Sequence, residues 1–354
     1  MTKAERLFTL KRLGNLLRWI TLTGVYFTPS DEEIELSKKL QRIIDENHHF
    51  NLWFDPFHVK YSLSALGLML DETRLENWAN RYIIPEDRIN RKTIAVVCAG
   101  NIPAVGFHDF LCVLVSGHNI LVKLSSDDLL LLPWFSEFLH NTNPEFKNII
   151  TITEGTISGF DAVIATGSNN TSRYFEYYFG KYPHIFRRNM NSIAILDGQE
   201  SPQELSGLVD DILIYYGRGC RNVSFLLVPE NYDFSPLLDA FRKYSHYAYH
   251  SKFYNNYEYN KAVMLVNRIP FYDIGFMLLT SHPSIQSPLA VIHYQTYKKS
   301  DEIYSFLHFN RDKIQCNVSH IQGIPIKVDF GKSQQPALDD YADGVDTMKF
   351  LENL

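Results

Sequence analysis

The feature that most constrains the fold of this chain is a change in the pattern of apolar residues at Lys92. Beyond it, short β-branched apolar runs alternate with segments long enough to form helices. The runs occupy residues 93–97, 119–123, 148–153, 162–166 and 192–196. Near-continuous apolar strands separated by helices are typical of a parallel sheet that is covered on both faces. The sequence therefore predicts an α/β fold with a doubly wound parallel sheet, whose ligands bind at the carboxyl ends of the strands.

Helix-capping signals divide the 354 residues into segments. Ser30 and Glu33 form a capping box that opens a charged helix, because each side chain satisfies an orphan backbone amide. SPQE at 201–204 adds a proline at the first helical position, and predicts a helix that runs to Tyr216 and stops at Gly217. The predicted segments are N-terminal helices plus a nucleotide-binding domain (1–199, with the sheet starting near residue 92), a catalytic domain (200–325) and a C-terminal segment (326–354).

Charge and cysteine spacing exclude several classes of function. The formal net charge is −6 and no basic footprint is visible, which argues against nucleic acid as a partner. The cysteines lie far apart without a CxxC pair, which indicates free thiols in a reducing compartment and no zinc cage. We therefore predict a cytoplasmic protein without a bound metal. The cysteines are Cys98, Cys112, Cys220 and Cys316.

Residues 7–27 are the candidate for a leader or a membrane anchor. Lys11, Arg12 and Arg18 interrupt this stretch, so it has neither the apolar core of a leader nor a span of ~20 apolar residues. Its leucines recur at helical spacing, which fits an amphipathic helix packed on the body of the protein or, alternatively, one docked on a membrane surface. We predict no transmembrane segment.

Cys220 lies between a glycine-terminated helix and a strand, in a turn with Arg218 and Arg221. A neighbouring cation favours the thiolate, which is the nucleophilic form. The flanking glycines let backbone amides and a bulky substrate approach closely. The alternative is a buried structural cysteine, which describes Cys98 and Cys112 better because their surroundings are apolar. We interpret Cys220 as a nucleophile.

Two further turns follow predicted strands. Asn101 follows the first strand, where a side-chain amide can point at a developing oxyanion, although asparagine is also an ordinary turn residue. Thr166, Gly167 and Ser168 follow a later strand and precede a helix, where amides and hydroxyls can meet a phosphate. There is no GxGxxG fingerprint. We interpret the second turn as cofactor-binding, although each motif alone is a weak signal.

The order of these pieces resembles the aldehyde dehydrogenase superfamily from about Lys92 to the C-terminus. Asn-x-Pro follows a first strand, Val-Lys ends the second, Thr-Gly-Ser follows a later one, and Gly-x-Gly-Cys comes last. Within that superfamily, YYGRGCRNVS and FGKSQQPALDDYADGVDTMKFL resemble the LuxC-type acyl-CoA reductases. The resemblance implies an aldehyde-dehydrogenase-like fold, with a doubly wound cofactor domain and an α/β catalytic domain that carries the nucleophilic cysteine.

The resemblance also implies catalytic roles. Cys220 matches the family's nucleophile, and Asn101 matches the asparagine that forms the oxyanion hole with the amide of that cysteine. RRNMN at 187–191 matches the stretch in which hydrolytic members carry a general-base glutamate, and it contains no carboxylate. That glutamate activates the water that hydrolyses the acyl-enzyme, whereas a reductase should keep water inactive. The missing base favours acyl-CoA reduction over oxidation of an aldehyde to a free acid.

For the cofactor, the resemblance points to three positions. Lys123 matches the lysine that holds the adenosine ribose, and Ser168 matches a serine that meets the pyrophosphate. Ser126 stands where family members often carry a glutamate that grips the 2′-hydroxyl, and a serine leaves room for a 2′-phosphate. We therefore predict NADPH rather than NADH, although Asp127 next door weakens that preference. SIQSP at 284–288 lacks the family's ribose-binding glutamate, which leaves the positioning of the nicotinamide open.

Together these features predict an NADPH-dependent acyl-CoA reductase that converts a fatty acyl-CoA to the aldehyde through a Cys220 acyl-enzyme. The alternatives are a Cys-dependent acyltransferase without redox activity, a hydrolytic aldehyde dehydrogenase and a non-catalytic binding module. The expected partners are acyl-CoA or an acyl-protein thioester, with CoA as part of the substrate, and an acyl-protein synthetase or carrier protein as the acyl source. The resemblance also implies a homo-oligomer, for which IPIKVDF at 324–330 is the candidate strand. Tyr215, Tyr216 and Phe225 fit an acyl tunnel or an ordinary core equally well.

Overall fold

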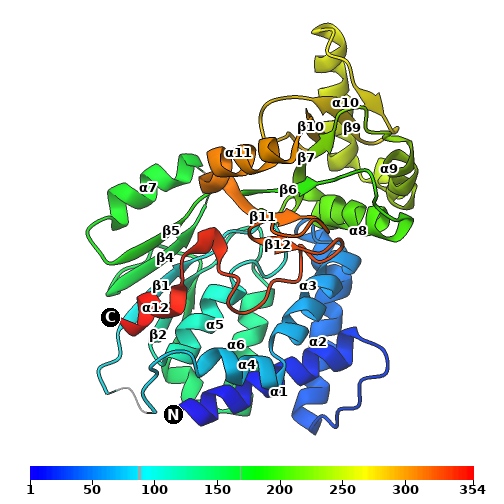
Figure 1. Ribbon diagram of the computed structural model, residues 1–354. Helices are drawn as coiled ribbons and strands as arrows, with labels where there is room; N and C mark the ends of the chain where they lie inside the picture. The colour runs from blue at the N-terminus through cyan, green and yellow to red at the C-terminus, as the bar shows by residue number, and fades with distance from the viewer. Residues whose placement is uncertain (87–88, 168) are drawn as a thin grey trace. The chain divides into compact units, whose positions relative to one another are not determined.

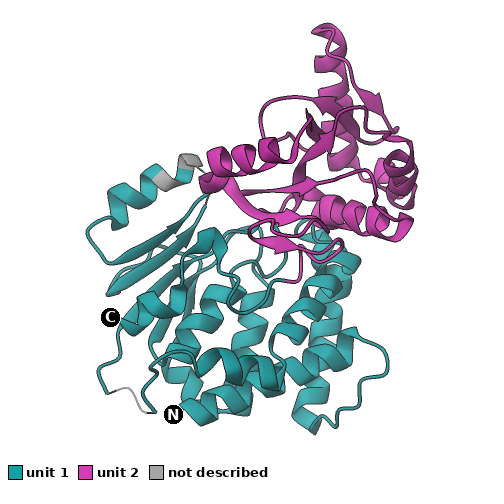
Figure 2. Ribbon diagram, viewed as in Figure 1, with its two compact units in different colours: residues 1–188, 336–354 teal, residues 189–335 magenta. Residues whose placement is uncertain are grey.

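Two sheets organise the described part of the chain, which in this computed structural model covers residues 1–86, 89–167 and 169–354. The chain divides into two compact units, which Figure 2 shows in different colours. Unit 1 comprises residues 1–188 and 336–354, and unit 2 comprises residues 189–335. Each unit contains one sheet (Figure 1). The predicted α/β fold class is confirmed.

The sheet of unit 1 is parallel throughout, in the order β3-β2-β1-β4-β5. The chain steps outward from β1 to β3 and then returns to the other side of β1 with β4. This reversal is a topological switch point, where the loops after neighbouring strands diverge and leave a crevice for ligands. The loops after β1 and β4 therefore border that point. The strands are β1 (Thr93–Val97), β2 (Asn119–Lys123), β3 (Ile150–Thr153), β4 (Ala162–Thr166) and β5 (His184–Arg187).

Alternate residues of these strands face two different cores. Ile94 and Val96 of β1 belong to the large core that includes the N-terminal helices, whereas Ala95 packs in a smaller cluster with Phe175 of α7. Successive side chains of a strand point to opposite faces, so helices cover both faces of the sheet, as the doubly wound arrangement predicts. The helices that connect the strands are α5 (Phe107–Ser116), α6 (Leu131–Thr142), η2 (Pro144–Asn148) and α7 (Asn169–Phe179).

The N-terminal helices bury a leucine stripe in unit 1. Leu10, Leu13 and Leu17 of α1 are fully buried, so this helix packs on the body of its unit instead of offering its apolar face to a membrane surface. The predicted capping box is confirmed: the Ser30 amide donates to the Glu33 carboxylate, and the Glu33 amide donates to the Ser30 hydroxyl. Within the described ranges, no helix combines the length and the apolar character that a bilayer crossing requires. These helices are α1 (Lys3–Thr21), α2 (Asp31–Glu46), η1 (Asn47–His49), α3 (Pro56–Met69) and α4 (Glu72–Ala79).

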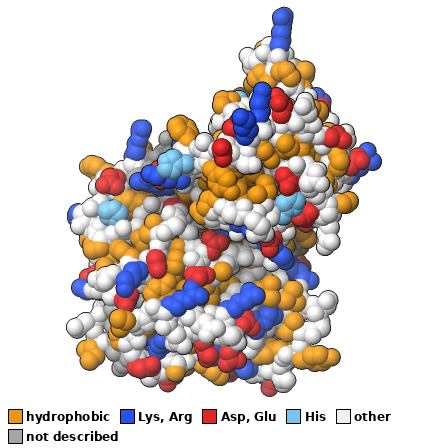
Figure 3. Space-filling model, in the orientation of Figure 1, with side chains coloured by type: hydrophobic (Ala, Val, Ile, Leu, Met, Phe, Trp, Pro, Cys, Tyr) orange, Lys and Arg blue, Asp and Glu red, His pale blue; other side chains and the backbone are white. Residues whose placement is uncertain are grey.

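Charged side chains are spread over the surface. On the face that Figure 3 shows, basic and acidic side chains are interspersed rather than gathered by sign. Some charged side chains of unit 1 form ion pairs across elements, as Lys11 does with Glu72 and as Arg81 does with Asp339. Such exposed pairs each contribute about 1 kcal/mol or less. The charges on this face are therefore of mixed sign and do not form a strong field of one sign.

The last residues of the chain return to unit 1. Trp78 Nε1 donates to the Tyr341 hydroxyl over 2.9 Å. Arg187, which is 3% exposed, donates to the Asp109 carboxylate over 2.7 Å and to the Thr347 hydroxyl over 2.6 Å. A buried guanidinium is tolerated only when it is paired in this way, so losing either end would leave a charge unpaired. The segment 336–354 is thus an integral part of unit 1. It contains η6 (Ala342–Gly344) and α12 (Thr347–Glu352).

The sheet of unit 2 runs in the order β12-β11-β6-β7-β10-β9-β8, and its neighbours are parallel except for the pair β8 and β9. β12 pairs with β11 of its own chain, and its role in an oligomer stays a prediction. The strands are β6 (Asn191–Ile195), β7 (Val223–Pro229), β8 (Tyr272–Asp273), β9 (Leu278–Ser281), β10 (Val291–Tyr297), β11 (Ile314–Val318) and β12 (Lys327–Val328). The helices are α8 (Pro202–Leu213), η3 (Ile214–Gly217), α9 (Ser235–Ala240), η4 (Phe241–Tyr249), α10 (Ser251–Val266), α11 (Ser300–Asn310) and η5 (Arg311–Lys313).

Three local predictions differ from the structure. The run at 192–196 does not join the first sheet but forms β6, inside the second, and the edge strand of the first sheet next to β4 is β5. The units consequently meet at 188/189 rather than at 199, and the predicted segment 326–354 is divided between them after residue 335. The helix predicted to reach Tyr216 ends at Leu213, because the backbone leaves the helical conformation at Ile214, with ψ 138°, and turns left-handed at Tyr215.

Candidate active site

Cys220 lies in an exposed turn between η3 and the amino end of β7. The other cysteines are buried. Burial raises the pKa of Cys98 to about 12 and the pKa of Cys112 well above its ordinary value, because an apolar environment disfavours the thiolate. Both stay protonated at neutral pH, which confirms their interpretation as core residues. Cys220 is the thiol that a substrate can reach, and its nucleophilic role stays a prediction.

The backbone that leads into this turn is strained. Tyr215, Tyr216 and Gly217 follow one another with φ values of 58°, 57° and 72°. A left-handed conformation costs on the order of 1–3 kcal/mol at each residue other than glycine, so surrounding contacts must hold it. The ring of Tyr216 supplies such contacts, with ring centroids 4.4 Å from Tyr247 and 4.3 Å from His250. Strain of this kind clusters at functional sites, which agrees with a reactive residue in the turn.

The aromatic residues near the nucleophile are packed inside unit 2. Tyr215 and Tyr216 are 4% and 5% exposed, and Phe225 is fully buried. Phe225 lies in a hydrophobic cluster with Ile193 of β6, and its ring is stacked on that of Phe306. These contacts are those of an ordinary core, the second of the two interpretations that the sequence leaves open.

Two side chains tie the Cys220 turn to its surroundings. The side-chain oxygen Oδ1 of Asn222 accepts from the backbone amide of Gly219 over 2.8 Å, and the backbone amide of Asn222 donates to the Gly219 carbonyl over 3.0 Å. Behind the turn, the Ser192 hydroxyl donates to the Cys220 carbonyl over 3.1 Å and lies 3.1 Å from the sulfur of Cys316. The main chain on both sides of Cys220 is therefore fixed, while its side chain remains exposed.

The FGKSQQP segment, which carries part of the sequence resemblance, packs against α8. The Asp211 carboxylate accepts the amides of Gly331 and Ser333 over 2.7 and 2.9 Å. Burial raises the pKa of Asp211 to about 6, although the two amides oppose that shift. At Gly207, an added Cβ would lie 2.9 Å from the Gly331 nitrogen, so the two main chains need the glycine to approach this closely. Arg221 also donates to the Ser333 carbonyl, which joins this segment to the Cys220 turn.

Most of the predicted cofactor residues lie along one edge of the unit 1 sheet. Val97 pairs with Lys123 on one side and with Ala165 on the other, so the carboxyl ends of β1, β2 and β4 are level. Asn101 follows β1, and Thr166 ends β4. These residues therefore border the switch point at which open α/β sheets bind their ligands.

The side chains at this edge are partly accessible. Ser126 and Asp127 are exposed, and the Lys123 ammonium donates to the Glu154 carbonyl. At Gly167 an added Cβ would lie 2.9 Å from the ring of Phe175, so this turn needs a glycine. Ser168, which the sequence assigns to the pyrophosphate, lies outside the described residues. The edge thus offers hydroxyl, ammonium and amide donors, the chemistry that a phosphate or a ribose requires.

A buried carboxylate that the sequence did not single out holds the Asn101 loop. Asp128 is 5% exposed, and its carboxylate accepts a hydrogen bond from the backbone amide of Ala104 over 2.8 Å. Ala104 itself has a left-handed backbone with φ 57°. Burial raises the pKa of Asp128 to about 6. The Ser62 hydroxyl donates to the neighbouring Pro103 carbonyl over 2.8 Å. Two buried hydrogen bonds therefore hold the loop after β1, which is the support that a loop needs if it is to aim an amide at a substrate.

The predicted catalytic pair is distributed over the two units. Cys220 belongs to unit 2, and Asn101 belongs to unit 1 together with the cofactor residues. The structure thus assembles the cofactor candidates at one sheet edge and the nucleophile in its own supported turn. The catalytic and cofactor roles stay predictions that rest on the sequence resemblance. The residues at the unit 1 edge are Asn101, Lys123, Ser126, Thr166 and Gly167.

Sequence reasoning missed a carboxylate beside the stretch that lacks the general base. Asp343 Oδ2 accepts the amide of Arg188 over 2.6 Å. Desolvation raises the pKa of Asp343 above its ordinary value, and the Arg188 amide opposes this shift. The stretch at 187–191 therefore has a carboxylate next to it in space, although none in its own sequence. The 155 positions between the two residues explain why no local motif could reveal the contact.

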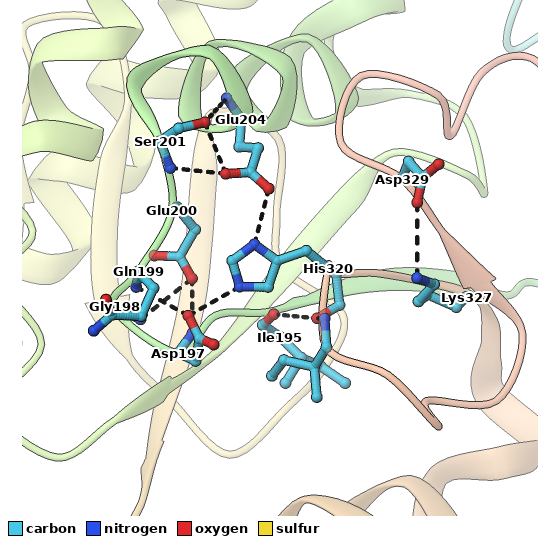
Figure 4. A network of polar contacts seen from close by, with 12 residues as sticks. Ile195, Asp197, Gly198, Gln199, Glu200, Ser201, Glu204, His320, Lys327 and Asp329 are labelled. Atoms are coloured by element: carbon cyan, nitrogen blue, oxygen red, sulfur yellow. Dashed lines mark hydrogen bonds and ion pairs between the residues drawn. The ribbon is translucent and has the colours of Figure 1, made fainter.

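A second polar cluster lies at the carboxyl edge of the unit 2 sheet (Figure 4). His320 contacts Asp197 through Nε2 at 3.0 Å and Glu204 through Nδ1 at 2.8 Å. Asp197, Glu200 and His320 offer ligand atoms within 4.8 Å of one another, a geometry that could hold a metal ion. In the described structure, however, both ring nitrogens contact carboxylates, and Glu200 Oε1 accepts the Asp197 amide over 2.7 Å. The cluster therefore satisfies its own polar atoms.

Comparison with known proteins shows a similarity in fold but no match in sequence. No family model matches the chain, and no curated protein matches it in sequence. Aldehyde dehydrogenase 21 from Physcomitrella patens, solved with its reaction product succinate, is similar with a TM-score of 0.67 and 12% identity over 100% of this chain and 84% of that one. An aldehyde dehydrogenase from Bacillus cereus, solved with NAD+, has a TM-score of 0.62 at 12% identity over 92% of this chain and 73% of its own. An NADP-dependent enzyme from E. coli has a TM-score of 0.61 at 12% identity over 92% and 74%.

These similarities define the class of fold. The structures from Physcomitrella patens and Bacillus cereus are named as aldehyde dehydrogenases, and the chain has an aldehyde-dehydrogenase-like α/β fold, as the sequence motifs predict. At 12% identity the similarity establishes architecture, whereas activity must be argued from the site.

Proposed function

We propose that this protein is a nicotinamide-dependent oxidoreductase of aldehyde chemistry and, more specifically, an NADPH-dependent acyl-CoA reductase that releases a fatty aldehyde. The observation that carries the proposal is the exposed Cys220 in a strained, supported turn of an aldehyde-dehydrogenase-like fold. The LuxC-type motifs around this cysteine and near the C-terminus support the choice of a reductase. The stretch at 187–191 also supports a reductase, because its own sequence contains no carboxylate that could act as the general base of a hydrolytic enzyme.

In the proposed reaction, the Cys220 thiolate attacks the thioester carbonyl and forms a carbon–sulfur bond. Asn101 and the Cys220 amide stabilise the oxyanion, and its collapse expels the CoA thiolate and leaves an acyl-enzyme. A nicotinamide cofactor, when bound, would supply the hydride, whose two electrons the acyl carbon needs for its reduction. With a proton from solvent, this gives a thiohemiacetal on Cys220. Its collapse releases the aldehyde and returns the cysteine. Covalent capture thereby replaces one hard displacement by two easier steps.

The residues at the unit 1 edge fit a dinucleotide by their donor chemistry. Lys123 would bind the adenosine ribose, and Thr166 and Gly167 would offer a hydroxyl and an amide to the pyrophosphate. Ser126 leaves room for a 2′-phosphate, which favours NADPH. Ser126→Glu should reverse this preference, because a carboxylate repels the 2′-phosphate and accepts from a 2′-hydroxyl. A ratio of the kcat/KM values for NADPH and NADH that stays unchanged would argue against this position.

The main test follows NADPH absorbance with acyl-CoA substrates of medium to long chain length, in wild type and Cys220→Ser. We expect NADPH consumption that needs both acyl-CoA and Cys220, with one CoA released per NADPH. Acylation of Cys220 without NADPH consumption would instead identify an acyltransferase, or a reductase whose acyl group arrives on a carrier protein. Repeating the assay with an acyl-protein thioester separates these outcomes.

The contact between Asp343 and Arg188 favours a second candidate, a hydrolytic aldehyde dehydrogenase. A carboxylate with a raised pKa beside this stretch has the chemistry of a general base that activates water. This candidate predicts that the protein forms NADPH from an aldehyde without CoA, and that Asp343→Asn abolishes this activity. For the reductase, the same variant should keep CoA-dependent activity.

A further inference from the structure

Asn222 lies two residues after the proposed nucleophile and is 3% exposed. Its Nδ2 group lies 2.8 Å from the carbonyl oxygen of Ile214, 3.0 Å from that of Asp211 and 3.2 Å from that of Ile212. Its Oδ1 accepts the amide of Gly219. One buried side chain therefore joins the carbonyl end of α8 to the residue that precedes Cys220.

The carbonyl end of a helix is electrostatically unfavourable for a thiolate. The last carbonyls of α8 lack partners within the helix and carry partial negative charge. The left-handed turn that follows does not continue the helix, so these groups need other donors. A side-chain amide can donate to carbonyls and accept an amide at the same time, whereas a carboxylate can only accept. Asparagine is therefore the residue that satisfies both sides of this junction.

We propose that Asn222 is the positioning residue of the Cys220 turn: it neutralises the carbonyl end of α8, holds the Gly219 amide, and so lets the turn present Cys220 as a thiolate. This inference deepens the proposed function and rests on its assignment of Cys220 as the nucleophile. Asn222 acts through the turn and does not itself contact a substrate. The charged and titratable groups around the turn include Arg218 and Arg221 within it, Asp211 at the end of α8, Cys316 behind Ser192 and His250 against Tyr216, together with the phenols of Tyr215, Tyr216 and Tyr247.

The test measures the rate of Cys220 alkylation by iodoacetamide as a function of pH, read by mass spectrometry for each cysteine. It needs neither acyl-CoA nor nucleotide, so it is independent of the reductase assay. The variants are Asn222→Asp and Asn222→Ala. The matched control is Asn317→Asp on β11, since Asn317 is 2% exposed and its Nδ2 donates to the Pro325 carbonyl over 2.7 Å. The buried cysteines report folding in the same spectra, because they become alkylated only if the variant unfolds.

We expect the midpoint for Cys220 in wild type to lie below about 8.5, the value of an ordinary thiol. Asn222→Asp should raise this midpoint by about one pH unit, which slows alkylation about tenfold below the midpoint. Asn222→Ala should raise the midpoint by less than the aspartate variant does. If Asn222→Asp unfolds and its buried cysteines become alkylated, the midpoint of Asn222→Ala tests the inference instead. Asn317→Asp should leave the midpoint unchanged.

Three results would overturn the inference. If both Asn222 variants keep the wild-type profile, or if Asn317→Asp shifts it equally, Asn222 does not position the thiolate. A wild-type midpoint at the ordinary value would remove the basis of the nucleophile assignment as well. If the protein consumes NADPH with neither acyl-CoA nor an acyl-protein thioester but shows the expected series of midpoints, this inference stands and the proposed function is rejected.

Discussion

The two edges of the unit 2 sheet are built in opposite ways. At the amino end of β7, a left-handed backbone presents an exposed thiol above buried polar supports. At the carboxyl ends of β6 and β11, His320 and its carboxylates form a network on the surface, with residues that are partly exposed and satisfied by one another. The first edge stores strain that packing must hold, whereas the second edge gains stability from charge pairing. This contrast separates the candidate for chemistry from the candidate for stability.

The largest expected effect is on activity at the first edge. Cys220→Ser should lower reductase activity by roughly 10⁴-fold or more, because the variant loses the acyl-enzyme route. Its free energy of unfolding should stay close to that of wild type, since the side chain is exposed. Steady-state NADPH oxidation and urea unfolding check the two parts. Residual acylation of the serine variant at another residue would show that Cys220 is not the nucleophile.

The packing that holds the strained turn should dominate stability at this edge. Tyr216→Ala should lower the free energy of unfolding by about 3 kcal/mol, because it removes a buried ring that contacts Tyr247 and His250 and keeps the left-handed backbone. Tyr249→Ala is the matched control: Tyr249 is 91% exposed, so this change should stay within about 0.5 kcal/mol. Equal effects in denaturant unfolding would mean that the ring does not hold the turn.

A pair of glycines allows a direct comparison of the two edges. Gly217 at the first edge and Gly198 at the second have φ values of 72° and 85°. Gly217→Ala should cost about 1–2 kcal/mol of unfolding free energy, from the left-handed backbone alone. It should cost more than Gly198→Ala, because its new Cβ would lie 3.2 Å from the Ile212 oxygen, whereas at Gly198 the nearest atom is 3.9 Å away. Thermal unfolding of both variants provides the ranking, and a reversed order would contradict it.

The smallest effect should be a pH-dependent one at the second edge. Hydrogen bonds to Glu204 and Asp197 raise the pKa of His320 against the opposing effect of burial, and the Ser201 amide and His320 lower the pKa of Glu204 to about 2. The histidine contribution is complete below its ordinary value of 6.5 and is lost as the pH rises through the raised value. The glutamate contribution is complete above 4.5 and is lost as the pH falls toward about 2. The network is therefore strongest between these limits.

His320→Asn should accordingly lower stability by about 1 kcal/mol or less near pH 5 to 6, and by less at higher pH. Thermal unfolding of both proteins across the pH range measures the difference. Adding a divalent cation to wild type supplies a further control, since the same residues could hold a metal ion. A difference that grows above pH 8 would contradict the assigned direction of the His320 pKa.

The sequence predicts the fold well where local pattern determines structure. The runs at 93–97, 119–123 and 162–166 are strands with those bounds, because β-branched residues between turn signals leave little choice. The run at 192–196 is also a strand, but its membership of the second sheet depends on pairing partners far along the chain. Strand β5 escaped notice because four residues with two aromatic rings give almost no periodic signal.

The site follows the same division. A glycine-rich turn with two arginines identifies Cys220 from a few neighbouring residues. The residues that support it do not share that signal: Asn222 acts through carbonyls eight to eleven positions earlier, and Asp343 reaches Arg188 across the length of unit 2. The left-handed Tyr215 is hidden for a similar reason, since tyrosine does not favour that backbone and only packing imposes it.

The return of residues 336–354 to unit 1 has a consequence for biosynthesis. Unit 2 is a continuous stretch inserted into a discontinuous domain. While the chain emerges from the ribosome, unit 2 has all of its residues before unit 1 does, although unit 1 begins first. Until the last segment arrives, Arg187 lacks the Thr347 hydroxyl and the carbonyl of Ala342, and Trp78 lacks its acceptor. The core of unit 1 therefore includes side chains that are synthesised only after the whole of unit 2.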